Sequence, residues 1–487
     1  MNISNFINGS HSSPSSSPSF SSINPQTNEF IASIPLSSSQ EIDLAVQAAH
    51  AAFPRWSATS RAQRSAYLTA IADAIHARHE EFAVWESRDQ GKTLARARVE
   101  VDRAIANFRY FATFILHETS TARFTPDERV LTYEHRSARG VFALISPWNM
   151  PLYLLTWKIA PCLAFGCTGV AKPSELTSIT AYLLSEIFVQ VRLPPGVMNI
   201  VYGDGSTGAD LVRHGFIQGI SFTGGTQTGI RIRQDTAADI QKHLSLELGG
   251  KNATIVFDDA DLDAAVDVAA KAAFENQGEI CLCGSRIYIH QSIYHQFVSK
   301  FVEHVSRTYI PGDTLGAVIS LAHYNKIRSY LTLAKQEDFL LGGVPPENPT
   351  NGYWISPCIL KNNDNQSPLC QEEIFGPVVT VSPFDTEEEA VSLANDSKYG
   401  LAAILLTKDG ARMRRVGERL QAGLVWVNCW LVRELGTPFG GMKASGVGRE
   451  GGSILKMCFV WFVFCIALCS MRCIVCEANI YLLNRDI

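Results

Sequence analysis

The chain has 487 residues, of which 46% are hydrophobic, and its formal net charge is −5. This length and composition are enough for two or three hydrophobic cores. Without a basic run, nucleic acid is not an expected partner. The N-terminus lacks a basic stretch leading into an apolar one, so we expect a cytoplasmic protein and read its 12 cysteines as reduced thiols.

The first part of the chain predicts a tail followed by helices. Residues 10–22 are rich in Ser and Pro and are expected to form a flexible loop or tail. Ser38 and Glu41 have the spacing of a capping box, which marks the start of a helix. Helical periodicity returns over residues 60–89 and again over residues 94–112.

After residue 139, short apolar runs alternate with helical stretches. The runs lie at residues 140–145, 169–172, 199–202, 220–223, 253–257, 286–290 and 378–383. Such alternation is typical of parallel sheets whose strands are joined by helices. We therefore predict an α/β fold with two Rossmann-like parallel-sheet domains, divided near Gly250.

Two glycine-rich loops each follow a predicted strand and precede a predicted helix. Residues 203–208 match GxGxxG, but no acidic residue ends a following strand at the usual distance, so a simple turn is the favoured interpretation. Residues 222–229 form the better candidate. Gly224 and Gly225 would let the backbone approach a pyrophosphate at a helix N-terminus.

A third turn carries Lys172 and Glu175, three residues apart. A lysine and a carboxylate placed in this way can bind the two hydroxyls of a ribose. A glutamate at the 2′-hydroxyl would repel a 2′-phosphate, which favours NAD over NADP.

Several segments resemble motifs of the aldehyde dehydrogenase superfamily, in the family's order and with its spacing. They are SPWN (146–149), AKPSE (171–175), FTGGTQTG (222–229), LELGGKN (246–252), FENQGEIC (274–281), EEIFGP (372–377) and PFGGMKASGVGRE (438–450). The resemblance runs from residue 5 to residue 452. It implies an NAD-binding domain at 1–118 and 139–249, a catalytic domain at 250–452 and an oligomerisation hairpin at 119–138.

Three further segments resemble one branch of this family, whose members oxidise semialdehydes in tryptophan (kynurenine) catabolism. They are NQGEICLCGSR (276–286), YEHR (133–136) and NCWLVREL (428–435). The resemblance implies a small aldehyde substrate that carries a carboxylate at the end opposite the aldehyde.

Cys281 and Cys283 lie two residues apart in QGEICLCGSR. By themselves they could be a metal half-site, a redox pair, a packing contact or a nucleophile with a neighbour. A disulfide between them would strain the ring, and no further metal ligands flank the pair. The resemblance implies that Cys281 is the nucleophile and that Cys283 packs beside it.

The resemblance implies two more catalytic residues. Asn149, together with the backbone N–H of Cys281, would donate to the oxyanion of the thiohemiacetal, and an amide does so without titrating. Glu247 would be the general base that activates water to hydrolyse the thioester. Taken alone, Asn149 could be a turn residue and Glu247 a carboxylate that caps a helix.

The resemblance also implies NAD as cofactor and no metal. Lys172 and Glu175 would bind the adenine ribose, and Glu373, with Phe375 packed beside it, the nicotinamide ribose. Without the motif, the acidic pair at residues 372–373 would indicate only a solvated surface. The remaining expected cofactor contacts are Ser146, Trp148, Gly224 and Gly225.

A carboxylate on the substrate requires a cation that can bind it bidentately, which favours arginine. Arg103 lies in the predicted helix that lines the family's substrate tunnel, and Arg433 lies in the loop before the last motif. Arg103 could instead pair with Glu100, and Arg433 with a surface acid. Arg109 is expected to be structural. Without these arginines, a neutral aldehyde would be the expected substrate.

The chain departs from the family pattern in residues 453–487. Residues 457–471 form an apolar run that is too short to span a bilayer. We interpret this segment as an alternative or misread end of the coding sequence, and a membrane-associating tail is the alternative. The hairpin at 119–138 would then lack its partner strand, which puts the family-like homodimer or homotetramer in question.

Three other functions are alternatives to a semialdehyde dehydrogenase. One is an aldehyde dehydrogenase of broader specificity, and another is a non-catalytic protein that keeps the fold. A cysteine hydrolase would need a histidine base paired with Cys281, and none of the 12 histidines lies in a recognisable motif.

Overall fold

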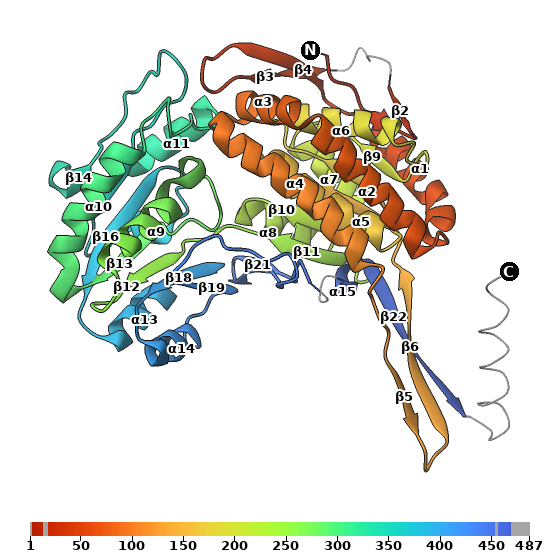
Figure 1. Cartoon of the computed structure of the whole chain (residues 1–487). Helices are drawn as coiled ribbons and strands as arrows, with labels where there is room; N and C mark the ends of the chain where they lie inside the picture. The colour runs from red at the N-terminus through yellow and green to blue at the C-terminus, as the bar shows by residue number, and fades with distance from the viewer. Residues whose placement is uncertain (1, 13–17, 453–455, 469–487) are drawn as a thin grey trace.

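The structure, a computed structural model, describes residues 2–12, 18–452 and 456–468. Two α/β units lie side by side, and a long hairpin extends away from them (Figure 1). The expected α/β class with two parallel-sheet units is therefore confirmed. In the described part of the chain, no helix is both long and apolar enough to cross a membrane.

The first sheet has a parallel centre made by four of the expected apolar runs and β11. Its last strand comes from residues 446–447, so the chain returns to the first sheet after it has built the second. In sheet order the strands are β2 (Ser10–His11), β1 (Phe6–Ile7), β9 (Met198–Ile200), β8 (Thr168–Lys172), β7 (Val141–Ile145), β10 (Ile217–Thr223), β11 (His243–Glu247) and β21 (Gly446–Val447).

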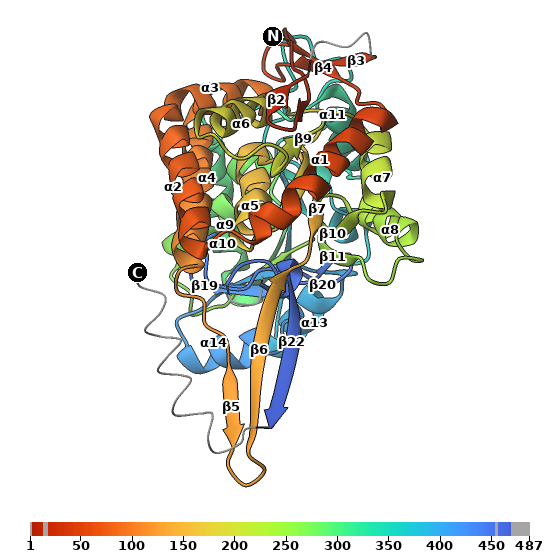
Figure 2. The same cartoon turned by 90° about the vertical axis from the view of Figure 1, so that its right-hand side faces the viewer.

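Helices cover both faces of this sheet (Figure 2). The long helix expected over residues 60–89 is instead two helices, because the backbone of Arg78 leaves the helical region at φ −112° and ψ 22°. The Arg78 side chain binds Glu81 and Glu186 at this break. The helices are α1 (Ser39–Ser57), α2 (Arg61–Ala77), α3 (His79–Gln90), α4 (Leu94–Phe114), α5 (Pro151–Ala164), α6 (Ile179–Gln190), α7 (Gly205–Arg213) and α8 (Thr226–Asp235).

The loop expected over residues 10–22 is wrong where the structure describes it. Residues 10–11 form β2, and β3 (Ser19–Ile23) pairs with β4 (Phe30–Pro35); residues 13–17 lie outside the described part. The polar β3 is stable as a strand because Ala32 and Ile34 of its partner are fully buried. The capping box at the start of α1, by contrast, is present as predicted.

The second sheet is parallel except for its first edge strand. In sheet order its strands are β14 (Phe339–Leu341), β15 (Cys358–Lys361), β16 (Val378–Phe384), β13 (Arg286–His290), β12 (Ala253–Val256), β18 (Ala402–Leu406) and β19 (Leu424–Val427), and β17 (Tyr399–Gly400) pairs separately with β20 (Met442–Lys443). Its helices are α9 (Leu262–Phe274), α10 (Tyr294–Thr308), α11 (Leu321–Leu331), α12 (Pro368–Gln371), α13 (Glu387–Asn395) and α14 (Gly410–Gly417), with 3-10 turns at Glu275–Gly278, Gln291–Ile293 and Gln336–Asp338.

The prediction that the hairpin lacks its partner strand is wrong. The hairpin consists of β5 (Ala122–Thr125) and β6 (Val130–Ala138), and β22 (Val460–Leu468) pairs with β6 along its whole length (Figure 2). Aromatic and β-branched residues give the apolar run a strong strand propensity. Just before it, α15 (Lys456–Phe459) places the Phe459 ring 4.6 Å from that of Phe142 in the first core. Residues 469–487 of the predicted tail lie outside the described part.

Candidate active site

Cys281 lies in the loop between α9 and β13, at the junction of two pockets that it lines together with Asn149. Ahead of it, Asn276 and Gln277 adopt left-handed backbone conformations, with φ of 51° and 59°. The Asn252 amide donates to the carbonyl oxygens of Cys281 at 2.7 Å and of Cys283 at 2.8 Å, which fixes the loop. Cys283 itself is buried among apolar side chains.

The Cys281 thiol is held in its neutral form. Burial raises the pKa of this thiol to about 12, and the nearby carboxylates of Glu373 and Glu247 add to the effect, whereas Arg433 opposes it. Because the thiolate is the nucleophile, a base has to remove this proton before Cys281 can attack.

Asn149 lies in the turn between β7 and α5, one residue before the N-cap Met150, and its side chain is buried. Its Nδ2 donates to the carbonyl oxygen of Glu279 at 2.8 Å, two residues before Cys281. An amide nitrogen has two N–H groups, so a second donor remains to serve an oxygen atom bound beside the thiol.

Glu247 is the last residue of β11 and is buried. Among the described residues, neither of its carboxylate oxygens has a hydrogen-bond partner. Burial and, to a smaller degree, the Glu450 carboxylate raise the pKa of Glu247 well above its ordinary value, against the opposing effect of Lys158. A carboxylate with a raised pKa and free oxygens is suited to accept a proton near neutral pH.

The first pocket is lined by five of the residues expected to bind the cofactor. Glu373 Oε1 accepts from the backbone N–H of Gly250 at 3.0 Å. A Cβ atom at Gly249 would lie 2.1 Å from Glu373 Oε2, so only glycine leaves room for this carboxylate. Phe375 has a left-handed backbone with φ of 63°, which turns the chain directly after Glu373. The expected residues that line this pocket are Trp148, Gly224, Gly225, Glu373 and Phe375.

The other three predicted cofactor residues lie at the ends of neighbouring strands and do not line this pocket. Lys172 Nζ is 3.7 Å from Glu175 Oε2, and burial lowers the pKa of Lys172. Ser146 is buried next to Lys172, and its hydroxyl has no partner among the described residues. All three follow parallel strands at the edge where α/β sheets bind nucleotides.

The GxGxxG segment at residues 203–208, for which the sequence favours a simple turn, lies close to Lys172. A Cβ at Gly208 would lie 3.7 Å from Lys172 Cδ. Asp204 caps α7 by accepting from the backbone N–H of Ser206 at 2.8 Å, so this loop is the turn into a helix that the sequence favoured.

The second pocket contains both arginines that the sequence singled out for the substrate. Arg433 Nη1 donates to the Tyr153 hydroxyl at 2.6 Å, and its guanidinium lies 4.6 Å from the ring centre of Trp157 and 4.2 Å from that of Phe439. Its Nε and Nη2 are buried and have no hydrogen-bond partner in the described part of the chain. These two atoms form one edge of the guanidinium fork, which binds a carboxylate bidentately.

Among the described residues, Arg103 does not pair with Glu100, and Arg433 does not pair with a surface acid. Glu100 is bound by Lys92 instead of Arg103. Arg103 lines the pocket with no hydrogen bond or ion pair to another described residue, and Arg109 makes an exposed pair with Asp73, as expected of a structural residue.

Sequence reasoning missed residues on both sides of Cys281. Arg96, which pairs with Glu275, lines the second pocket, and Lys326 lines the first. His323 also lines the first pocket, where its Nε2 donates to the carbonyl oxygen of Phe375 at 2.6 Å. For this site the sequence offered one signal, the spacing of two aromatic residues. Tyr153 and Trp157 lie one and two helical turns after Asn149.

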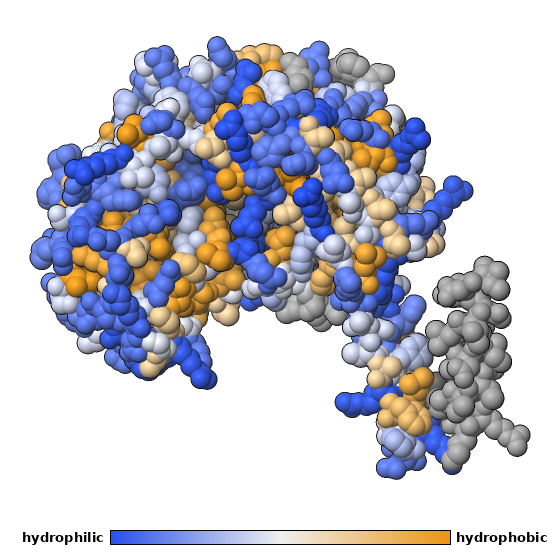
Figure 3. Space-filling model, viewed as in Figure 1, coloured by the Kyte–Doolittle hydropathy of each residue, from blue (hydrophilic) through white to orange (hydrophobic). Residues whose placement is uncertain are grey.

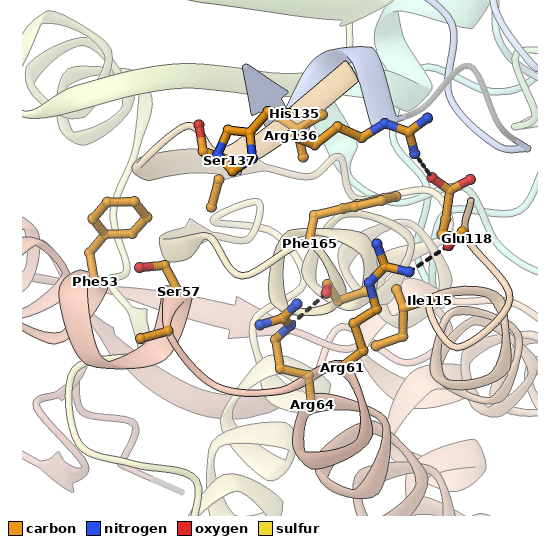
Figure 4. A pocket seen from close by; sticks show the side chains of 14 residues that line it. Phe53, Ser57, Arg61, Arg64, Ile115, Glu118, His135, Arg136, Ser137 and Phe165 are labelled. Atoms are coloured by element: carbon orange, nitrogen blue, oxygen red, sulfur yellow. Dashed lines mark hydrogen bonds and ion pairs between the residues drawn. The ribbon is translucent and has the colours of Figure 1, made fainter. Parts of the chain in front are cut away.

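A third pocket lies away from Cys281, at the base of the hairpin (Figure 4). There Arg61 and Arg136 both bind Glu118, through its carbonyl oxygen and its carboxylate respectively. Arg64 donates to the carbonyl oxygen of Ala164 at 2.8 Å, at the end of α5. These contacts join the hairpin to the first unit. They involve none of the residues predicted to take part in catalysis or in binding the cofactor or the substrate.

Residues 12–460 match the aldehyde dehydrogenase family. The 2-aminomuconic semialdehyde dehydrogenase of Danio rerio is 48% identical to the chain over 88% of this chain and 91% of its own length. The enzyme of the same name from Homo sapiens is 48% identical over 92% and 94%. Betaine aldehyde dehydrogenase from Staphylococcus aureus, solved in complex with NAD+, superposes with a TM-score of 0.91 at 36% identity, covering 95% of this chain and 94% of its own.

Proposed function

Because the chain belongs to the aldehyde dehydrogenase family, we propose that it oxidises an aldehyde to a carboxylic acid with NAD, and that its substrate is 2-aminomuconate 6-semialdehyde, which it converts to 2-aminomuconate. The observation that carries the choice of substrate is the free edge of Arg433 in the pocket beside Cys281. The two relatives described above, each 48% identical to the chain, act by their names on 2-aminomuconic semialdehyde.

In the first half-reaction, Cys281 attacks the aldehyde carbon as a thiolate. The proton of the thiol therefore needs an acceptor. Glu247 takes this role, because it lines the second pocket beside Cys281 and is one of the two carboxylates that raise the pKa of the thiol. The oxygen of the aldehyde then becomes an alkoxide, which Asn149 Nδ2 and the backbone N–H of Cys281 stabilise as hydrogen-bond donors.

In the second half-reaction, Glu247, having released the Cys281 proton to solvent, takes a proton from water, and the resulting nucleophile hydrolyses the thioester on Cys281. Its unpartnered oxygens and raised pKa suit this role. The acid leaves, and Cys281 returns to its resting thiol.

The residues predicted to bind the cofactor fit NAD. Glu373 and the pair Lys172–Glu175 supply ribose-binding groups, and α8 begins at Gly225 without a side-chain cap, which leaves its first N–H groups free for a pyrophosphate. NAD supplies one chemical capacity there, the acceptance of a hydride from the substrate carbon. We propose residues 1–118 and 139–249 as the NAD-binding domain and 250–452 as the catalytic domain.

The substrate pocket selects for a distal carboxylate. The Nε and Nη2 atoms of Arg433 would bind it bidentately, while Tyr153 holds Nη1 and keeps the fork in place. Arg103 adds a second positive charge to the same pocket. An uncharged aldehyde would leave the buried edge of Arg433 without a partner.

The test is NADH formation by the purified chain with 2-hydroxymuconic semialdehyde, a more stable analogue, and with hexanal. We expect a strong preference in kcat/KM for the carboxylate-bearing substrate. Equal rates would reject the substrate assignment and leave a dehydrogenase of broad specificity. No reaction with either aldehyde would reject the enzymatic function.

We further propose that the chain is a homodimer or homotetramer in the cytoplasm, joined through its hairpin. Four residues share one face of the three-stranded sheet and are each between 40% and 49% exposed: Phe124, Tyr133, Trp461 and Val463. Figure 3 shows that hydrophobic residues reach the surface of the hairpin. An apolar face of this kind favours association with a second copy. Size-exclusion chromatography with light scattering should give a dimer or tetramer, and a monodisperse monomer would contradict the proposal.

A further inference from the structure

Three charged side chains lie buried directly behind Asn149. Glu86 comes from α3, Glu100 from α4, and Lys92 from the turn between these two helices. Each has no more than 1% of its surface exposed. None of them lines either pocket at Cys281, so none can touch the substrate or the cofactor.

The three side chains bind the backbone on both sides of the Asn149–Pro151 turn. Lys92 Nζ donates to the carbonyl oxygen of Asn149 at 3.1 Å and forms an ion pair with Glu100. Glu86 Oε1 accepts from the N–H of Leu152 at 3.2 Å, and Glu100 Oε1 accepts from that of Tyr153 at 3.5 Å.

These contacts replace the ordinary cap of α5. Met150 stands at the N-cap position and offers no side-chain hydrogen bond, and Pro151 has no N–H. The next two N–H groups, of Leu152 and Tyr153, have no partner inside the helix. Two carboxylates from other helices satisfy them, so the start of α5 is fixed to α3 and α4 and not only to itself.

Stability alone is a poor reason for this arrangement. A serine or aspartate at position 150 would cap the helix with its own side chain. In addition, replacing a buried ion pair with apolar residues of similar size is often neutral or stabilising. The buried charged groups instead form hydrogen bonds in fixed directions to a single turn, the one that carries Asn149, the proposed oxyanion donor.

We propose that Lys92, Glu86 and Glu100 are positioning residues that hold Asn149 in the geometry needed to stabilise the oxyanion. The inference rests on the proposed function, in which Asn149 is that donor. On the opposite side, Asn276 Nδ2 donates to the same carbonyl oxygen of Asn149 at 3.2 Å, so the turn is bound from both units. A displacement of about 1 Å in such a donor can lower turnover about 100-fold.

The test is a double-mutant cycle between one paired change and Asn149→Ala. Lys92→Met with Glu100→Gln removes the bond to Asn149 and leaves no unpaired charge, and it is made both in the unaltered chain and in Asn149→Ala. Arg109 lies on α4, as Glu100 does, and Arg109→Met breaks only its exposed pair with Asp73 of α2, so this variant is the matched control. Turnover, the KM of the aldehyde, NAD binding and the melting temperature are measured for each.

We expect the paired change to lower kcat about 10- to 100-fold in the unaltered chain and less than about twofold in Asn149→Ala, with KM and NAD binding unchanged. A merely structural role would lower activity equally in both backgrounds, which would overturn the inference. Unchanged activity would overturn it as well. If the unaltered chain forms no NADH, the proposed function fails instead, and this inference fails with it.

A second variant covers the case in which the paired change does not fold. Glu86→Leu removes only the acceptor for Leu152, whereas Glu86→Gln keeps an oxygen at that place. Burial, with the Glu100 carboxylate, raises the pKa of Glu86 well above its usual range. Both variants replace the carboxyl group with an uncharged side chain, so they differ from each other in the oxygen that Gln retains. Rescue of kcat by Gln but not by Leu supports the positioning role, and equal activity of the two variants would contradict it.

Discussion

The two sides of Cys281 are built in different ways. On the cofactor side, backbone groups and glycines dominate: Gly250 donates to Glu373, Gly249 leaves room for it, and α8 starts uncapped at Gly225. On the substrate side, the proposed recognition group is a side chain, Arg433, which is surrounded by aromatic rings from α5 and from the loop at Phe439.

The difference follows from what each side has to recognise. A cofactor common to a whole family can be bound by backbone geometry, which short motifs specify locally. A substrate has to be distinguished from similar aldehydes, and that requires side chains with particular charge and shape. Substitutions on the cofactor side should therefore weaken NAD binding, and substitutions on the substrate side should change the preference between aldehydes. Substitutions at Cys281 and Glu247 should stop the reaction for every aldehyde.

The largest effect is expected at the residue shared by both sides. Cys281→Ala removes the nucleophile and should lower kcat by about 10⁴-fold or more with any aldehyde. NAD binding, measured by fluorescence titration, should persist. Cys283→Ala is the matched control, and we expect it to keep its activity; equal losses in the two variants would refute the assignment of the nucleophile.

Glu247→Gln should lower steady-state turnover about 10²- to 10³-fold. Since Glu247 acts as a base only when it is ionised, and burial raises its pKa, the activity of the unaltered chain should fall as the pH is lowered through that raised pKa. The variant should lose this limb of the pH profile, and its first turnover of NADH should slow as well, because Glu247 also takes the proton of Cys281. A profile that survives in Glu247→Gln would mean that another group is the base; Glu388→Gln on the exposed α13 is the control.

Arg433→Met tests the substrate side alone. With the carboxylate-bearing semialdehyde, kcat/KM should fall about 30- to 150-fold, equivalent to about 2–3 kcal/mol for the loss of one partner of a charge pair. With hexanal it should change little, because no carboxylate is present to bind. A similar loss with both aldehydes would show that Arg433 supports the pocket and does not select the substrate.

Gly249→Ala tests the cofactor side alone and should have the smallest effect. The added methyl group would collide with Glu373 and displace its carboxylate, so we expect NAD to bind about tenfold more weakly, with the ratio between the two aldehydes unchanged. Gly215→Ala, where a methyl group meets no atom within 4 Å, is the control. Unaltered NAD binding in Gly249→Ala would argue against the role of Glu373.

The sequence by itself determined the features that local chemistry controls. Alternating apolar runs gave the two parallel-sheet units, the Ser38 cap gave the start of α1, and motif order identified the family and placed Cys281, Asn149 and Glu247 as candidates. Strand propensity and capping act over a few residues, so they can be read from a short segment.

Only the tertiary structure decided how distant segments combine. It broke the helix at Arg78, gave β6 a partner in β22, and joined residues 446–447 to the first sheet. It also gave Glu100 to Lys92, which left Arg103 without that acidic partner, and it buried Arg433 in a pocket where no acidic residue of the described part of the chain pairs with it. Such pairings depend on which groups are buried together, and burial is a property of the whole fold that no single segment carries.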